Sequence, residues 1–122
     1  MNVALWALQG FLAFAFLAAG TLKLLQPKEK LTANPKLGWA NDFSAGQVKL
    51  IGLSEFLGAV GLIVPRLTGI LPVLTPVAAA GLVVIMIGAV ATHVRRKEAA
   101  APPAILGLLA ALVAIGRFVV VP

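Results

Sequence analysis

"VALWALQGFLAFAFLAAGTLKLL", residues 3–25, is a run in which Lys23 is the only charged side chain. At a rise of about 1.5 Å per residue, a helix of this length crosses a hydrocarbon core of about 30 Å. No Lys or Arg precedes the run, and it is longer than the apolar region of a signal peptide. We therefore expect a retained membrane-spanning helix.

Three more apolar runs follow, over residues 47–64, 72–93 and 102–121. The 122 residues are 61% hydrophobic and 11% charged, with a mean hydropathy of +1.03. Soluble domains carry about a quarter charged residues, and one of this size could not bury so much apolar surface. We predict an all-α fold: a single domain (1–122) that forms an up-down-up-down bundle of four transmembrane helices.

The connections carry local signals for helix ends. Ser44 and Gln47 have the spacing of a capping box that opens the second helix. Pro65 is expected to end that helix, while Pro102 and Pro103 suit the first turn of the fourth. A short surface helix is expected over residues 37–43, with its aromatic side chains at the membrane interface.

The Lys and Arg residues predict the orientation of the bundle. Eight of them flank the loops after the first and third spans, and only Arg66 and Arg117 lie on the other side. By the positive-inside rule, the loops 26–46 and 94–101 are cytoplasmic and both termini lie outside. A bacterial inner membrane fits this pattern. We expect Arg95, Arg96 and Lys97 to fix the topology and to touch lipid headgroups, and Arg117 to extend toward the interface.

Glu55 is the unusual residue, because it lies inside the apolar stretch 50–65. The ten Leu, Ile, Val and Phe residues of the second span favour insertion by about 3 to 6 kcal/mol. A charged residue at the centre costs about 2.5 to 3.5 kcal/mol on the same scale. Gly52, Gly58 and Ala59 share the helix face of Glu55 and allow another helix to approach closely. The carboxyl should therefore point into the bundle.

Lys23 and His93 close the first and third spans on the same side of the membrane as Glu55. A Lys23–Glu55–His93 cluster in the cytoplasmic half is geometrically plausible. It is open whether the cluster is structural, as an ion pair or a hydrogen-bonded protonated Glu55, or functional, as a binding or proton-handling site. The ionisation state of Glu55 is equally open.

Other polar or small residues suggest packing rather than chemistry. Gln9, Thr21 and Ser54 are able to hydrogen bond across helices. Gly81 and Gly88 share one face of the third helix and indicate a packing groove, either within the bundle or between the protomers of a homodimer. Met86 is interpreted as core filler.

No metal, catalytic or nucleic-acid site is expected. The chain has one histidine and no cysteine, so a transition-metal site would rest on carboxylates. No nucleophile–base set, phosphate loop or paired carboxylates are visible. The net charge of +6 belongs to membrane loops rather than to a nucleic-acid surface. We do not expect enzymatic activity from this chain alone, and no cofactor is evident.

Four stretches together resemble the DoxX-like family. They are "AAGTLKLLQP" (18–27), "GWANDFS" (38–44), "IGLSEFLGAVGLIVP" (51–65) and "LTPVAAAGLVVIMIGAVATHVRRKE" (74–98). The resemblance implies a small four-helix integral membrane protein. The family takes its name from a subunit associated with a thiosulfate:quinone oxidoreductase, and a distant animal relative is a chaperone for receptor assembly. The family's polar positions correspond to Lys23, Glu55, His93, Arg95, Arg96 and Glu98.

Three functional hypotheses follow. The first is a non-catalytic binding or accessory module that holds a lipid, a quinone or a partner membrane protein near Glu55. The second is a membrane subunit of a quinone-linked oxidoreductase, in which Glu55 or His93 relays protons. The third is a minimal transporter, which lacks an evident unwound segment in mid-membrane. The ligand, the physiological role and the oligomeric state are not determined by the sequence.

Overall fold

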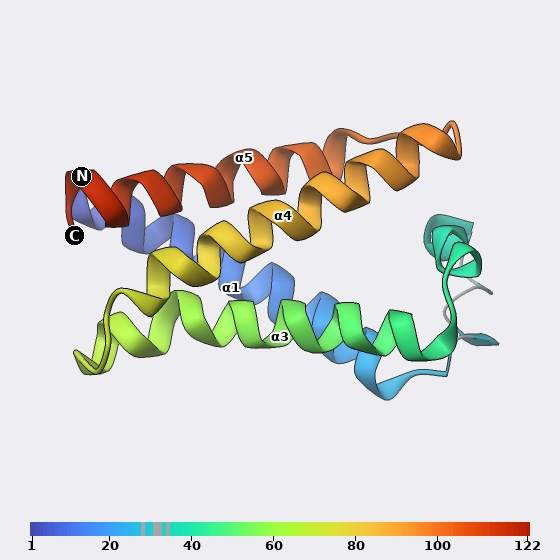
Figure 1. The fold of residues 1–122 in the computed structure, drawn as a ribbon, viewed down its shortest axis with the longest axis horizontal. Coiled ribbons are helices and arrows are strands. Elements are labelled where there is room, and N and C mark those ends of the chain that lie inside the picture. The colour runs from blue at the N-terminus through green and yellow to red at the C-terminus, as the bar shows by residue number, and fades with distance from the viewer. Residues whose placement is uncertain (28, 31–32, 34) are drawn as a thin grey trace.

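The computed structural model describes residues 1–27, 29–30, 33 and 35–122. Four long helices run in alternating directions along the bundle, whose long axis is horizontal in Figure 1. Their bounds are α1 (Asn2–Leu25), α3 (Ala45–Thr68), α4 (Leu74–Arg95) and α5 (Ala101–Ile115), the last continuing as the π-helical turn η2 (Gly116–Val120). The predicted all-α, up-down-up-down bundle is confirmed.

Each of the four helices is long and apolar enough to span a membrane. They contain 24, 24, 22 and, with η2 included, 20 residues. Their outward surfaces are rich in Leu, Ile, Val and Phe side chains, such as Phe14, Leu57 and Leu108, which only a lipid environment would cover. The chain is therefore an integral membrane protein.

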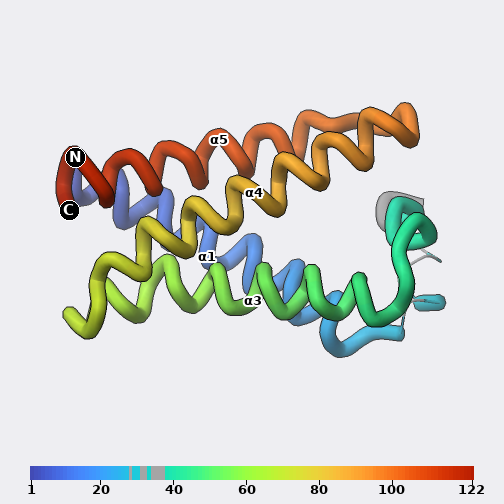
Figure 2. The backbone as a smooth tube through the Cα atoms, viewed as in Figure 1, coloured from blue at the N-terminus to red at the C-terminus, as the bar shows by residue number. Residues whose placement is uncertain are grey.

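The helices associate as two neighbouring pairs, α1 with α3 and α4 with α5, which are joined mainly by contacts between α3 and α4. The backbone path in Figure 2 places both chain termini at the same end of the bundle as the α3–α4 connection (residues 69–73). We call this the termini end. The opposite end, where α1 and α4 finish and α3 and α5 begin, is called the loop end.

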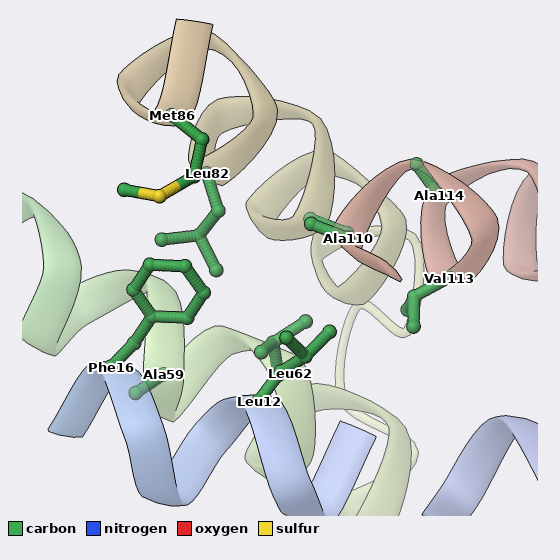
Figure 3. Packing of buried hydrophobic residues seen from close by; sticks show 10 residues of the cluster. Leu12, Phe16, Ala59, Leu62, Leu82, Met86, Ala110, Val113 and Ala114 are labelled. Atoms are coloured by element: carbon green, nitrogen blue, oxygen red, sulfur yellow. The ribbon is translucent and has the colours of Figure 1, made fainter. Parts of the chain in front are cut away.

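A continuous apolar core joins all four helices. Figure 3 shows Phe16 of α1 directed toward Leu82 and Met86 of α4, with Leu12 and Leu62 meeting between α1 and α3. Met86 is only 6% exposed, which confirms its role as core filler. The complete cluster comprises Leu12, Phe16, Ala59, Leu62, Ala79, Leu82, Met86, Ala110, Val113 and Ala114.

The second helix is longer than predicted, because Pro65 does not end it. The helix continues to Thr68 and is capped by Gly69, whose φ of 73° lies in the left-handed region. A proline in the last turn removes a single backbone hydrogen bond, and the Thr68 hydroxyl donates to the carbonyl of Val64 at 2.8 Å. The third helix begins at Leu74 rather than Pro72 and extends to Arg95.

The start of α3 follows the predicted capping box. The Gln47 amide donates to the Ser44 hydroxyl at 3.1 Å, and the Ser44 amide donates to the Gln47 side-chain oxygen at 2.9 Å. Before it, residues Pro35–Asp42 form the 3₁₀ helix η1, which confirms a short helix in this loop. In Figure 1, η1 lies across the loop end, beside the start of α3. Its Trp39 ring contacts the Lys23 ammonium of α1.

Candidate functional site

Glu55 and Lys23 form a buried ion pair between α3 and α1. The Lys23 ammonium Nζ lies 2.5 Å from the carboxylate Oε1 of Glu55. Only 4% of the glutamate side chain and 11% of the lysine side chain are exposed. Charged groups are rarely buried to this degree unless they are paired. The carboxyl therefore faces protein rather than lipid.

Two glycines position this ion pair. A Cβ atom added to Gly20 of α1 would lie 2.6 Å from the carbonyl oxygen of Gly52, and one added to Gly52 would lie 2.6 Å from the Cβ of Lys23. The two backbones are thus in direct contact, as small residues allow in membrane helices. The stem of Lys23 packs on Gly52, so that its ammonium meets Glu55 one turn further along α3.

Trp39 of η1 covers the lysine. Its ring centroid lies 5.3 Å from the Lys23 ammonium, within the range of a cation–π contact. The indole is supported by an edge-to-face contact with Phe43, at 5.9 Å between ring centroids, and by the buried residues Ala40 and Val48. The ammonium therefore has a carboxylate on one helix and an aromatic ring on η1.

The far end of η1 is attached to α4 by ion pairs. The carboxylate of Asp42 accepts from Arg96 Nη1 at 2.7 Å and from Arg95 Nη2 at 3.3 Å. Arg96 Nε also donates to Glu98 Oε1 at 3.1 Å. We call Asp42, Arg95, Arg96 and Glu98 the loop clasp. It joins the loop after α1 to the loop after α4.

The electrostatics of the clasp favour an ionised Asp42. Partial desolvation raises the pKa of its carboxyl, but the hydrogen bonds and positive charges of Arg96 and Arg95 outweigh this effect. The pKa of Asp42 therefore lies below its usual value of 3.8. The same pairing raises the pKa of Arg96, although desolvation acts against it. The clasp is thus held by charge at neutral pH.

The structure brings together two members of the predicted Lys23–Glu55–His93 cluster. His93 lies at the loop end, but its Nδ1 is 3.1 Å from Glu98 Oε1. Within the described residues, no hydrogen bond or ion pair joins His93 to Glu55 or Lys23. Lys97 sits at the turn after α4 with a φ of 58° and is exposed. Arg95 and Arg96 are engaged by Asp42, a contact that the sequence analysis did not anticipate.

The interpretation of Arg117 as a residue reaching toward the interface is wrong. It is only 2% exposed and points into the termini end. Its Nε donates to Gln9 Oε1 at 2.8 Å and its Nη1 to Asn2 Oδ1 at 2.8 Å, while Trp6 lies 5.4 Å away under the guanidinium. These neutral partners hold the guanidinium inside the bundle, so the side chain does not extend to the interface. The sequence analysis singled out Arg117 but predicted that its side chain points outward, whereas it points into the bundle.

The structure confirms some of the predicted packing roles of polar and small residues and not others. Gln9 does bond across helices, since its Nε2 donates to the Leu62 carbonyl at 2.6 Å. Ser54 instead donates to the Leu50 carbonyl of its own helix at 2.9 Å. Gly81 and Gly88 have open space where a Cβ would lie, so the groove within one bundle is excluded. Among the described residues, no group of three His, Asp or Glu side chains could hold a metal ion.

Comparison with known proteins places this arrangement in a family. No curated protein and no solved structure matches the chain. The model of the DoxX-like family, in contrast, matches residues 7–115, which include most of α1 and the whole of η1, α3, α4 and α5. The match covers both members of the buried ion pair and the whole loop clasp. The chain therefore belongs to the DoxX-like family.

Proposed function

We propose that this protein is a non-catalytic accessory module of the membrane, and that it binds a hydrophobic molecule or a partner membrane protein through a polar group at the Lys23–Glu55 pair. The observation that carries the proposal is the burial of this pair. An apolar pair of similar volume is often as stabilising as a buried ion pair, or more so. Ionisable groups inside membranes commonly mark binding sites.

The chemistry of the pair suits a ligand with a polar head and an apolar body. Lysine offers hydrogen-bond donors only, and the glutamate carboxylate accepts. A carbonyl or hydroxyl group could therefore take one place in the pair, while the surrounding apolar side chains hold the rest of the molecule. Trp39 covers the lysine from the loop end. A ligand or partner arriving from that side would displace the indole and compete for Lys23.

The loop clasp supports a controlled approach. Two of its members, Asp42 and Arg96, hold η1 over the end of the bundle. A partner with its own acidic or basic side chains could replace these ion pairs, which lie partly exposed at the surface. Opening the clasp would free Trp39 and uncover the ammonium below it.

The proposal includes an orientation. The loop end, which carries most of the Lys and Arg residues, faces the cytoplasm of a bacterial inner membrane, and the termini end faces outward. Membrane lipids surround the helices, and the exposed Arg95 and Lys97 side chains contact anionic headgroups. Attaching a reporter at either terminus and testing its accessibility in intact cells checks this orientation.

A second candidate is a membrane subunit of a quinone-linked oxidoreductase. It is favoured by the titratable groups His93 and Glu98, which are hydrogen bonded at the same end as the Lys23–Glu55 pair. A quinone carbonyl is also a suitable acceptor for the lysine ammonium. The electrons would come from a partner protein, and this chain would supply the quinone site and exchange protons.

Mass spectrometry of the protein in native lipid discs tests the main proposal. The wild type should retain a hydrophobic molecule or a partner protein that is lost or diminished in Glu55→Gln. Glu29→Gln is the matched control, because it neutralises a carboxyl in the loop after α1 that belongs neither to the buried pair nor to the loop clasp. Equal recovery in all three proteins, or nothing bound to the wild type, would count against the proposal.

Thermal unfolding separates the quinone alternative from the general one. A short-chain quinone at about 100 times its dissociation constant should stabilise the folded protein by about 2.7 kcal/mol. Glu55→Gln or Lys23→Met should reduce this shift in melting temperature. If a saturating quinone leaves the wild-type melting temperature unchanged, while another hydrophobic molecule still co-purifies, the accessory role stands and the quinone role does not.

A further inference from the structure

We propose that Arg117 and its neighbours at the termini end form a binding site for a single oxyanion, a carboxylate or a phosphate oxygen. This site lies at the opposite end of the bundle from the Lys23–Glu55 pair and is independent of the function proposed above. Its centre is a guanidinium that is 2% exposed. Arginine does not lose its proton in proteins, so the positive charge is permanent.

The contacts of Arg117 leave part of its hydrogen-bonding capacity unused. Nε donates to Gln9, and Nη1 donates to Asn2 and to the carbonyl of Val121 at 3.3 Å. All three acceptors are neutral oxygens. Nη2 is buried and has no hydrogen-bond partner among the described residues. The N–H groups of Nε and Nη1 all have acceptors, so the two N–H groups of Nη2 remain to donate to an oxyanion. Such charge-assisted hydrogen bonds are roughly twice as strong as those between neutral groups.

The charge distribution of the chain strengthens this inference. The sequence contains only four acidic side chains, and all of them lie in the loop-end half of the molecule: Glu29, Asp42, Glu55 and Glu98. The termini end holds Arg66 and Arg117, and the charge of Arg66 acts on Arg117. No side-chain carboxylate of this chain therefore neutralises the buried guanidinium. An anion from outside the chain would supply the missing charge.

The local backbone fixes the position of the guanidinium. Arg117 lies in the π-helical turn η2, which is closed by a 2.7 Å hydrogen bond from the Val121 amide to the Gly116 carbonyl. Turns of this kind frequently occur at functional sites. Gly116 packs so closely on Leu5 that an added Cβ would lie 2.5 Å from the leucine Cδ2. This contact sets Arg117 beside Trp6 and Gln9 of α1.

A second buried polar atom without a partner lies at the same end. It is the hydroxyl oxygen of Thr75, in the first turn of α4, a helix that η2 contacts. Thr75 is 0% exposed. Buried hydroxyl groups are normally hydrogen bonded. Thr75 therefore supplies a second unsatisfied hydrogen-bond donor at the termini end, in addition to Nη2 of Arg117.

Tryptophan fluorescence provides a local test. The chain has two tryptophans, so Trp39→Phe leaves Trp6, next to Arg117, as the single reporter. In discs of neutral phosphatidylcholine, sodium acetate and sodium phosphate are titrated at constant ionic strength against sodium chloride. In a second arm, the discs contain increasing oleate or phosphatidylglycerol. Saturation in the first arm identifies a soluble oxyanion, and saturation in the second arm alone identifies a lipid one; both outcomes support the site.

Variants of the two termini-end arginines complete the test. Arg117→Gln should abolish the response, and Arg117→Lys, which keeps the charge but loses the planar fork, should weaken the apparent affinity about tenfold. Arg66→Gln is the matched control and should keep a saturable response. The proposal is overturned if the wild-type reporter shows no saturable change in either arm, or if Arg66→Gln and Arg117→Gln reduce the response equally. The wild-type titration decides the matter even if Arg117→Gln does not fold.

Discussion

Gly20 and Gly52 bring α1 and α3 into backbone contact one turn before the Lys23–Glu55 ion pair on each helix. The Gly52 carbonyl oxygen and the Phe56 amide nitrogen would lie 2.6 Å and 2.7 Å from a Cβ placed on Gly20. These neighbours are backbone atoms, which cannot move aside as a side chain can. The distance between the two helices, and with it the geometry of the ion pair, therefore depends on the absence of a side chain at these positions.

Gly20→Ala should destabilise the bundle by about 1 to 3 kcal/mol, because overpacking forces the helix backbones apart. Gly10→Ala, on the same helix, is the matched control, since nothing lies within 4 Å of its added Cβ. Alanine favours a helix over glycine, so the control should be neutral or slightly stabilised. Melting temperatures in detergent check both. Equal destabilisation of the two variants would contradict the close contact.

The Lys23–Glu55 pair should show a large asymmetry between single and double substitutions. Glu55→Ala leaves a buried ammonium without its carboxylate and should cost about 3 to 5 kcal/mol. Glu55→Gln keeps a hydrogen-bond acceptor and should cost less. The double variant Lys23→Met with Glu55→Leu removes both charges and should recover most of the stability. Thermal unfolding of the wild type, of Lys23→Met, of Glu55→Leu and of the double variant measures the coupling between the two residues.

The same double variant separates structural from functional roles. If the pair serves binding, the double variant should keep most of the wild-type stability and fail to retain the co-purifying molecule or partner. A stable double variant that still retains it would assign the pair to structure alone. Similar melting temperatures for Glu55→Ala and Glu55→Gln would contradict a paired carboxylate.

The fold was predictable because the apolar character of each span is summed over all the residues of a helix. The four apolar runs and their polar or proline-containing connections gave the number, the order and the direction of the helices. The small residues around Glu55 indicated which face is buried, and Lys23 was correctly placed as a neighbour of Glu55. Helix ends were less predictable, as Pro65 shows, because one missing hydrogen bond in a last turn is tolerated.

The contacts missed by the sequence analysis involve distant residues. Arg117 bonds to Gln9 and Asn2, which are 108 and 115 positions away in the sequence. No helical periodicity reveals such a pair. His93 was misjudged for a local reason: the chain turns back after α4, and the Glu98 amide donates to the His93 carbonyl at 2.8 Å. This turn brings a nearer carboxylate to the imidazole than Glu55.

Substitution at Gly88 tests whether the face that carries Gly81 and Gly88 packs between two protomers, the alternative that remains for the predicted groove. Both glycines face outward from the bundle, with nothing within 4 Å of an added Cβ. Gly88→Leu should therefore leave the free energy of unfolding of the single bundle within about 0.5 kcal/mol of the wild type. If this face packs between two copies, the same variant should shift the oligomeric state in detergent, as measured by light scattering. A large loss of bundle stability would contradict the outward placement.

The loop clasp predicts a pH dependence that is located at Asp42. The folded-state pKa of this carboxyl lies below its unfolded value of 3.8, so the folded state binds the proton less readily than the unfolded state. Its contribution to stability is complete above that value and is lost as the pH falls through the lower folded-state pKa. Asp42→Asn has no carboxyl to titrate. Hydrogen exchange of the η1 amides should therefore be slower in the wild type than in Asp42→Asn at about pH 6, and the difference should shrink progressively below about pH 4. A difference that stays constant over this range would show that the ion pairs of Asp42 do not hold η1.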